Sequence, residues 1–123
     1  MEAHDVLAAL DGHPIWMTED GTASFWRLAS FNKGMVWVGR YSGESPWERH
    51  PDGDEFLYIV EGEVEVVVLT DERPVQTTVR AGSIFVVPRG RWHRQLARAA
   101  VMQLGVTTGR VEHSTAEYPG RDS

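Results

Sequence analysis

The sequence predicts an all-β domain in which antiparallel strands form a sandwich or a closed barrel. Most of the chain consists of short apolar segments rich in β-branched and aromatic residues, separated by glycine, proline, asparagine or aspartate. The clearest segment, Glu63–Val68, alternates so that Val64, Val66 and Val68 face a core while the glutamates face solvent. A chain of 123 residues is long enough for one core only, so we expect a single domain over 1–123.

The first segment is the exception to this strand pattern. Residues 1–12 predict an N-terminal helix, with its helical spacing of apolar residues over Glu2–Leu10. The acidic residues Glu2 and Asp5 suit a first helical turn, and Gly12 can end the helix.

The remaining segments follow one another as strands and turns. Asp20-Gly21 predicts a tight turn before the first strand, residues 43–53 predict a loop, and residues 117–123 predict a loose tail. The predicted strands are Ala23–Phe31, Met35–Tyr41, Glu55–Val60, Glu63–Leu69, Val75–Arg80, Ser83–Val87, Trp92–Leu96 and Ala99–Thr107.

Composition and charge exclude several classes of function. The formal net charge is −6 and Lys33 is the only lysine, which argues against a nucleic-acid-binding surface. The chain has no cysteine, so disulfides, thiolate metal sites and a cysteine nucleophile are excluded. No apolar run is long enough for a membrane span and no secretory signal pattern opens the sequence, so we expect a cytoplasmic protein that does not contact a membrane.

The segment around His50 carries the first group of candidate metal ligands. Glu48 and His50 point to the same face if this segment is extended, because side chains alternate along a strand. Pro51 and Gly53 then turn the chain, and this turn brings Glu55 back beside His50.

The segment around His93 supplies the other candidate. Pro88 and Gly90 form a turn that leads into His93, on a strand distant in sequence from His50. A site assembled from separate strands is held by the barrel rather than by a flexible loop.

These two segments resemble the two motifs of the cupin family, small β-barrels that usually hold a metal ion. The resemblance covers roughly the central half of the chain and implies a jelly-roll barrel of antiparallel strands. The positions that fit the family spacing are His50, Glu55 and Gly62 in the first motif and Gly82, Pro88, Gly90 and His93 in the second. The chain departs from the pattern in that Glu48 replaces the first histidine and Ala97 replaces a frequent asparagine, while Gly43 lies one residue closer.

The expected metal site consists of Glu48, His50, Glu55 and His93. Imidazole and carboxylate ligands suit one divalent transition metal per chain, namely Fe, Mn, Ni, Co or Zn, and do not choose among them. Several alternatives stay open: the histidines could be surface or hydrogen-bonded core residues, Glu48 could pair with Arg49, and Asp54 could replace Glu55 as the ligand.

Side chains near the motifs are candidates for the wall of a pocket. Trp47, Trp92, Arg40 and Gln103 are the pocket candidates, with barrel-end packing as the alternative for the two tryptophans. Arginines near the motifs could bind a substrate carboxylate, or could be solvated or paired with acidic neighbours. The alternation of side chains along the strand, or parity, does not decide whether Gln103 or Met102 faces the interior. The other histidines, His4, His13 and His113, are expected at the surface, without partners in register.

The resemblance implies a metal-dependent enzyme acting on a small oxygen-rich metabolite, as a dioxygenase, isomerase or hydrolase. The alternatives are a non-catalytic module that binds or senses a metal or metabolite, and a storage-type protein with an occupied site. A small-molecule ligand is the expected partner. A homodimer is also expected, because similar cupins commonly pair through their sheets and the first half of the chain is rich in apolar residues: Phe25, Trp26, Leu28, Phe31, Met35 and Trp37.

Overall fold

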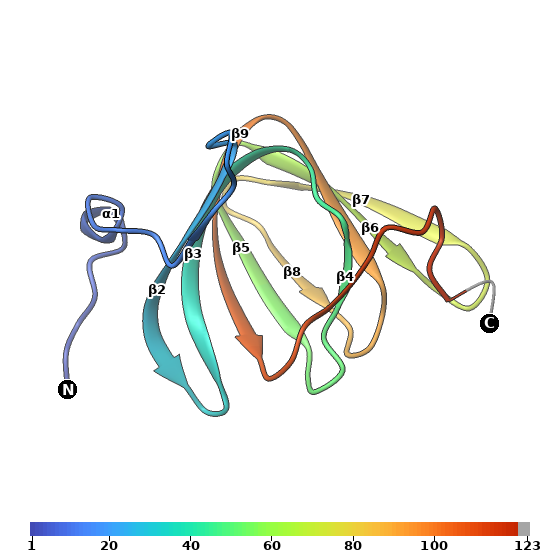
Figure 1. The fold of residues 1–123 in the computed structure, drawn as a ribbon, viewed down its shortest axis with the longest axis horizontal. Helices are drawn as coiled ribbons and strands as arrows, with labels where there is room; N and C mark the ends of the chain where they lie inside the picture. The colour runs from blue at the N-terminus through green and yellow to red at the C-terminus, as the bar shows by residue number, and fades with distance from the viewer. Residues whose placement is uncertain (121–123) are drawn as a thin grey trace.

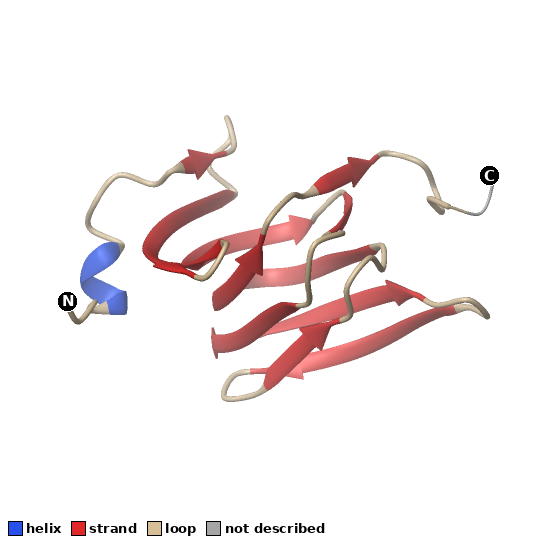
Figure 2. Ribbon diagram, turned by 90° about the horizontal axis from the view of Figure 1, so that it is seen from below, coloured by secondary structure: helices blue, strands red, loops and turns tan. Residues whose placement is uncertain are grey.

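A computed structural model describes residues 1–120 of the chain. In this part of the chain all ten strands belong to one antiparallel sheet, which curls into an open half-barrel (Figures 1 and 2). The prediction of an all-β fold with a short N-terminal helix is therefore confirmed. The elements are α1 (Val6–Ala9), β1 (Trp16–Met17), β2 (Ala23–Phe31), β3 (Gly34–Glu44), β4 (Trp47–Arg49), β5 (Glu55–Glu61), β6 (Glu63–Leu69), β7 (Pro74–Arg80), β8 (Ile84–Val87), β9 (His93–Thr108) and β10 (Glu112–Ser114).

Strand β9 is the central strand of the half-barrel. It pairs with β3 along most of its length, with β6 and β4 near its start, and with β5 near its end. The sequence predicted two strands here, Trp92–Leu96 and Ala99–Thr107, and that prediction is wrong because β9 runs continuously through residues 97–100. Ala97, Ala99 and Ala100 are weak strand formers, and pairing with neighbouring strands on both sides of this stretch keeps the chain extended.

Three short strands lie where the residue pattern predicted no strand. Strand β4 lies within the predicted loop 43–53 and pairs with β9 and β10, while β1 pairs with β2. Such strands of two or three residues exist because a neighbour supplies their hydrogen bonds, which no local pattern reveals.

The ends of the chain differ in extent from their predictions. Helix α1 covers four residues instead of the expected 1–12, and the Asp5 side chain caps it by accepting a hydrogen bond from the Ala8 N–H. Of the predicted loose tail, residues 121–123 lie outside the described chain, and the Glu117 carbonyl accepts a hydrogen bond from the Trp47 indole.

The core has an interior part and an outer part. Inside the half-barrel, the predicted inward residues Val64, Val66 and Val68 are 1%, 0% and 7% exposed, as the alternation of this strand required. Leu57 and Ile59 also point inward, in phase with Glu55. On the outer face, α1 covers a cluster formed by Leu28, Val38 and Met102, and it lies beside β2 in Figure 1.

The apolar first half of the chain is used mainly inside this fold. Leu28 and Trp37 are buried, and Trp26 packs in the cluster beneath α1, whereas Phe31 remains 52% exposed. The homodimer therefore stays a prediction. Within residues 1–120, no helix is long and apolar enough to cross a membrane.

Candidate metal centre

Four side chains from separate parts of the sheet converge at one end of the half-barrel. Glu48, His50, Glu55 and His93 each direct one potential ligand atom inward, and these atoms all lie within 4.8 Å of one another. The convergence follows from the register, because Glu48 on β4 lies directly opposite His93 on β9. Side chains of directly opposed residues project to the same face of a sheet.

Two turns bring the remaining pair into place. The turn after β4 reverses the chain, so that Glu55 at the start of β5 lies beside His50. The Pro88–Gly90 turn of the second motif contacts the first motif directly, since the Gly90 N–H donates to the His50 carbonyl at 2.9 Å. Gly90 adopts a φ of 76°, which a residue with a side chain rarely adopts. Glycine at this position thus allows the two motifs to meet.

The centre of the cluster is closely spaced and mostly buried. The Nε2 atom of His50 lies 3.0 Å from Glu55 Oε2, and the Nε2 atom of His93 lies 3.4 Å from Glu55 Oε1. Glu48 Oε1 lies 3.8 Å from His50 Nε2 and 3.5 Å from His93 Nε2. His50, Glu55 and His93 are at most 4% exposed, whereas the Glu48 side chain is 26% exposed and lies toward the rim.

These contacts do not satisfy the imidazoles as hydrogen bonds would. The Nε2 atoms of His50 and His93 are buried, and neither has a hydrogen-bond partner among the described residues, although Glu55 oxygens lie 3.0 and 3.4 Å away. A buried polar atom without a hydrogen bond lowers the stability of the folded protein by about 1–3 kcal/mol. Around an octahedral ion with metal–ligand distances of about 2.1 Å, two ligand atoms lie about 3.0 Å apart at adjacent positions and about 4.2 Å apart at opposite positions. The observed separations of 3.0 to 3.8 Å fit a set of atoms arranged around a single ion.

Outer contacts fix the orientation of two members of the cluster. His93 Nδ1 lies 3.2 Å from the Arg91 carbonyl oxygen, which can only accept, so Nδ1 carries a proton and Nε2 points into the cluster; when the ring is neutral, its lone pair is on Nε2. The Thr107 hydroxyl donates to Glu55 Oε2 at 2.8 Å, and the Trp37 indole N–H donates to Thr107 Oγ1 at 2.8 Å. Such support of ligands by neighbouring groups is typical of metal sites.

Charge inside the half-barrel shifts the ionisation of the metal-free cluster. Burial disfavours the charged carboxylate of Glu55, but His50 and His93 outweigh burial and lower the pKa of Glu55 below its usual value. Burial likewise disfavours the charged imidazolium of His93, but Glu48 and Glu55 outweigh it and raise the pKa of His93 to about 9. Near neutral pH the metal-free cluster therefore holds a proton on His93 facing two carboxylates.

Metal uptake is expected to release this proton. Because the pKa of His93 is raised to about 9, a metal ion must displace a proton at any lower pH, and apparent affinity should rise about tenfold per pH unit from pH 7 to 9. Calorimetric titration in two buffers of different ionisation enthalpy measures the number of protons released. An affinity that stays constant across this range would contradict the assignment of His93 to the metal site.

The pocket candidates are divided between the interior and the outer surface. Gln103 is 1% exposed and faces the interior, whereas Met102 packs in the outer cluster beneath α1, which answers the question that parity left open. Arg40 is exposed. Trp47 is 2% exposed and packs beneath the Arg94 guanidinium. Trp92 packs beneath Arg49 and also lines a surface hollow, so its place in a pocket stays a prediction.

Interior polar groups that the sequence did not single out accompany Gln103. The Gln95 amide donates to Gln103 Oε1 at 2.9 Å, and the Tyr41 hydroxyl contacts the same oxygen at 3.5 Å. Burial, followed by the charges of Glu55 and Glu48, raises the pKa of Tyr41 well above its usual value. Tyr41 is therefore a neutral phenol that can donate a hydrogen bond inside the half-barrel.

Two alternatives left open by the sequence, Asp54 as a metal ligand and Arg49 as the partner of Glu48, differ from the contacts in the structure. Asp54 accepts a hydrogen bond from the Arg89 N–H at 2.8 Å and lies outside the cluster, and Arg49 pairs with Glu112 rather than with Glu48. His113 is exposed as expected, but the prediction that it lacks a partner is wrong. It lies on β10 directly opposite Glu48, and its Nε2 atom is 3.3 Å from Glu48 Oε2.

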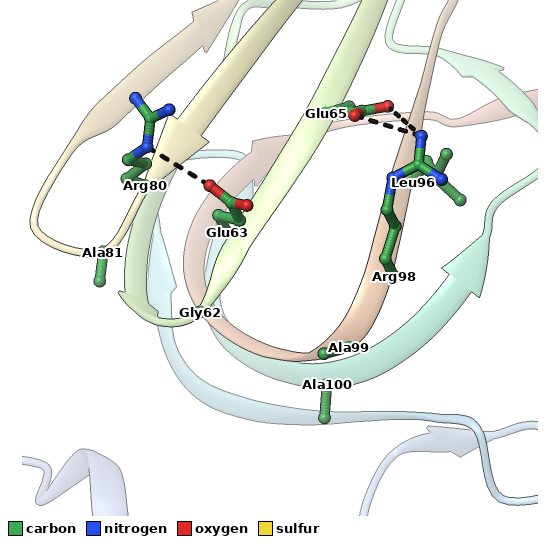
Figure 3. A pocket seen from close by; sticks show the side chains of 9 residues that line it. All are labelled: Gly62, Glu63, Glu65, Arg80, Ala81, Leu96, Arg98, Ala99 and Ala100. Atoms are coloured by element: carbon green, nitrogen blue, oxygen red, sulfur yellow. Dashed lines mark hydrogen bonds and ion pairs between the residues drawn. The ribbon is translucent and has the colours of Figure 1, made fainter.

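Two hollows at the surface are lined by residues other than the four cluster residues. One, of about 420 Å³, is bounded by the β6–β7 hairpin and the bend of β9, where Arg80 pairs with Glu63 and Arg98 with Glu65 (Figure 3). The other, of about 470 Å³, is lined by Trp92, by β10 including His113, and by the segment that follows β10. None of the four cluster residues lines either hollow.

Comparisons with known proteins agree with this arrangement. A family model described as a cupin domain matches residues 36–100, a stretch that contains all four cluster residues. The uncharacterized protein YdbB of Bacillus subtilis is 31% identical over 91 residues, which cover 73% of each chain. Germin-like protein 1-1 of Oryza sativa is 40% identical over 57 residues, and the matched part is only 26% of that longer protein.

Solved structures share the fold at low sequence identity. A cupin-2 domain protein from Shewanella frigidimarina superposes with a TM-score of 0.62 at 24% identity, covering 70% of this chain and 80% of that one. Oxalate decarboxylase of Bacillus subtilis, which is described with Mn(II) centres, superposes with a TM-score of 0.70 at 15% identity. That match covers 85% of this chain but only 30% of the decarboxylase, so it is a likeness of fold alone.

Proposed function

Since this chain belongs to the cupin domain family, we propose that Glu48, His50, Glu55 and His93 bind one divalent transition metal and that the centre acts on a small oxygen-rich metabolite. The observation that carries this proposal is the pair of buried imidazole Nε2 atoms, which face two carboxylates at short distance yet have no hydrogen-bond partner among the described residues. A divalent cation would satisfy these nitrogens and offset the carboxylate charge.

The donor set indicates the kind of ion. Two imidazoles with one or two carboxylates suit Fe, Mn, Ni, Co or Zn, and four protein ligands leave positions for a substrate on an octahedral ion. Manganese receives support from the Mn(II) centres of the structurally similar oxalate decarboxylase. When bound, such an ion supplies Lewis-acid polarisation of a substrate oxygen or, for a redox-active metal, activation of dioxygen.

The protein's own residues would orient the substrate and exclude water. Tyr41 is held neutral and can donate to a substrate oxygen, and the Gln95–Gln103 amides offer both donors and acceptors on the same interior. Burial of His50, Glu55 and His93 keeps bulk water from the centre, while partly exposed Glu48 lies at its rim. Small carboxylic, hydroxy or keto acids fit this combination of an ion and neutral hydrogen-bonding groups.

Turnover of metal-loaded protein is the direct test. We expect protein loaded separately with Mn(II), Fe(II), Co(II), Ni(II) or Zn(II) to convert at least one small acid, with oxalate among the candidates, as followed by product analysis and oxygen uptake. The Tyr41→Phe variant should bind metal normally and turn over substrate about 100- to 1000-fold more slowly, the range for loss of an oriented hydrogen bond at a reacting oxygen.

Metal held tightly without turnover of any candidate would support the alternative, a module that binds or senses a metal or metabolite.

A cytoplasmic location and a homodimer also remain predictions. Sedimentation at micromolar concentration tests the second of these, since a monomer would exclude it.

A further inference from the structure

We propose that His113 is a positioning residue of the metal centre, which holds the outer oxygen of Glu48 so that the inner oxygen stays directed at His50 and His93. This inference rests on the proposed metal function. It concerns a residue outside both motifs, on a strand near the C-terminal end of the chain.

Strand pairing places His113 in line with the ligands. His93 on β9, Glu48 on β4 and His113 on β10 are directly opposed in neighbouring strands, so that their side chains form a row on one face of the sheet. Glu112, the neighbour of His113, projects to the opposite face and pairs there with Arg49 at 3.1 Å.

The two oxygens of Glu48 have different partners. Oε1 faces the imidazoles of His93 and His50, at 3.5 and 3.8 Å, whereas Oε2 faces His113 Nε2 at 3.3 Å. His113 stands outside the set of side chains whose ligand atoms lie within 4.8 Å of one another, and its side chain is 55% exposed. It therefore acts on Glu48 rather than as a further ligand.

Glu48 lacks the outer hydrogen-bonding contacts that hold two of the other candidate ligands. Glu55 receives a hydrogen bond from Thr107, and His93 Nδ1 is held by the Arg91 carbonyl. Glu48 is the most exposed of the four. Outside the cluster, the side chain that contacts Glu48 among the described residues is His113. A glutamate held at one oxygen loses less rotamer freedom when its other oxygen binds a metal, which raises affinity.

The test is a double-mutant cycle read out by Mn(II) affinity, measured by electron paramagnetic resonance of free Mn(II). We expect His113→Ala to weaken Mn(II) binding by about 10-fold, the lower end of the effect of losing an outer-shell partner. His113→Gln, whose side-chain amide can take the place of the imidazole beside Glu48 Oε2, should recover most of the affinity. In a Glu48→Ala background, His113→Ala should have no further effect, because the carboxylate through which it acts is gone.

Glu112→Ala is the matched control, because it removes an ion pair from the same strand on the opposite face and should leave affinity within about twofold. Electron spin echo measurements on bound Mn(II) should find the same number of coordinated imidazole nitrogens in the wild type and in His113→Gln. Loss of one nitrogen in that variant would make His113 a ligand and overturn the proposal.

The remaining outcomes separate this inference from the function on which it rests. If the wild type and His113→Ala bind Mn(II) equally, or if the two substitutions in the cycle are additive, the positioning role is wrong and the metal site stands. If neither the wild type nor any variant retains Mn(II), Fe(II), Co(II), Ni(II) or Zn(II), both proposals fail together.

Discussion

Replacing either His50 or His93 with alanine is expected to reduce the metal content of the purified protein from about one ion per chain to nearly none. Each substitution removes one of the two imidazoles that face Glu55 across 3.0 and 3.4 Å. Because loss of an outer-shell partner alone costs about 10- to 100-fold in metal affinity, loss of a direct ligand should cost more than about 100-fold. Elemental analysis of protein purified without added metal, and again after reconstitution, measures the effect.

Thermal unfolding provides a second reading of the same substitutions. An ion that binds only the folded state stabilises it by about 2.7 kcal/mol at a free concentration 100 times its Kd, so added metal should raise the unfolding temperature of the wild type. The same addition should leave both variants unchanged. His4→Ala and His13→Ala are the matched controls, because both histidines are exposed and distant in sequence from the cluster. Equal metal content in the wild type and both cluster variants would remove the basis of the proposed function.

The strands that could be predicted are those in which local pattern and tertiary environment agree. Glu63–Leu69 was predicted with its observed bounds, because its valines alternate and its interior face is buried. Ala23–Phe31 was likewise bounded correctly between turn residues. By contrast, β4 and β10 are short strands whose hydrogen bonds come from each other and from β9, and nothing in their own residues favours a strand.

The same distinction explains what could be predicted of the site. Glu48, His50, Glu55 and His93 were identified because motif spacing fixes where each lies relative to a turn, and the structure brings these four together. Thr107 and His113 were missed because their positions depend on how β9 and β10 register against other strands. Threonine in a late strand and histidine near the end of a chain are common, so their role becomes visible only when the neighbouring strand is known.

The second large effect is expected at Gly105, where β9 passes the ring of Trp37. Gly105 lies directly opposite Trp37 on β3, and a Cβ atom built at Gly105 would overlap the indole ring. The ring has little freedom to move, because Trp37 is 7% exposed, packs edge-on against Phe25 and donates to Thr107 at 2.8 Å. Gly105→Ala is therefore expected to destabilise the protein by about 1–3 kcal/mol through overpacking, measured by urea denaturation.

The control for this substitution separates packing from the general effect of replacing glycine. Gly12 is exposed, its φ is not positive, and a Cβ atom there would lie 3.4 Å from the nearest atom, the Ala9 carbonyl oxygen. Gly12→Ala should thus change stability by less than about 1 kcal/mol. If both substitutions have the same small effect, the indole does not confine Gly105.

The Gly105→Ala substitution should also affect the metal centre. The indole that must move donates a hydrogen bond to Thr107, and Thr107 donates one to Glu55. Gly105→Ala is accordingly expected to weaken metal binding as well as folding, although it lies outside the cluster. Combining it with Trp37→Phe, which removes the part of the ring that overlaps, should recover stability relative to the sum of the single substitutions. The double variant should not recover metal affinity, since phenylalanine cannot donate to Thr107. Recovery of both properties together would mean that the hydrogen bond from Trp37 to Thr107 has no part in orienting Glu55.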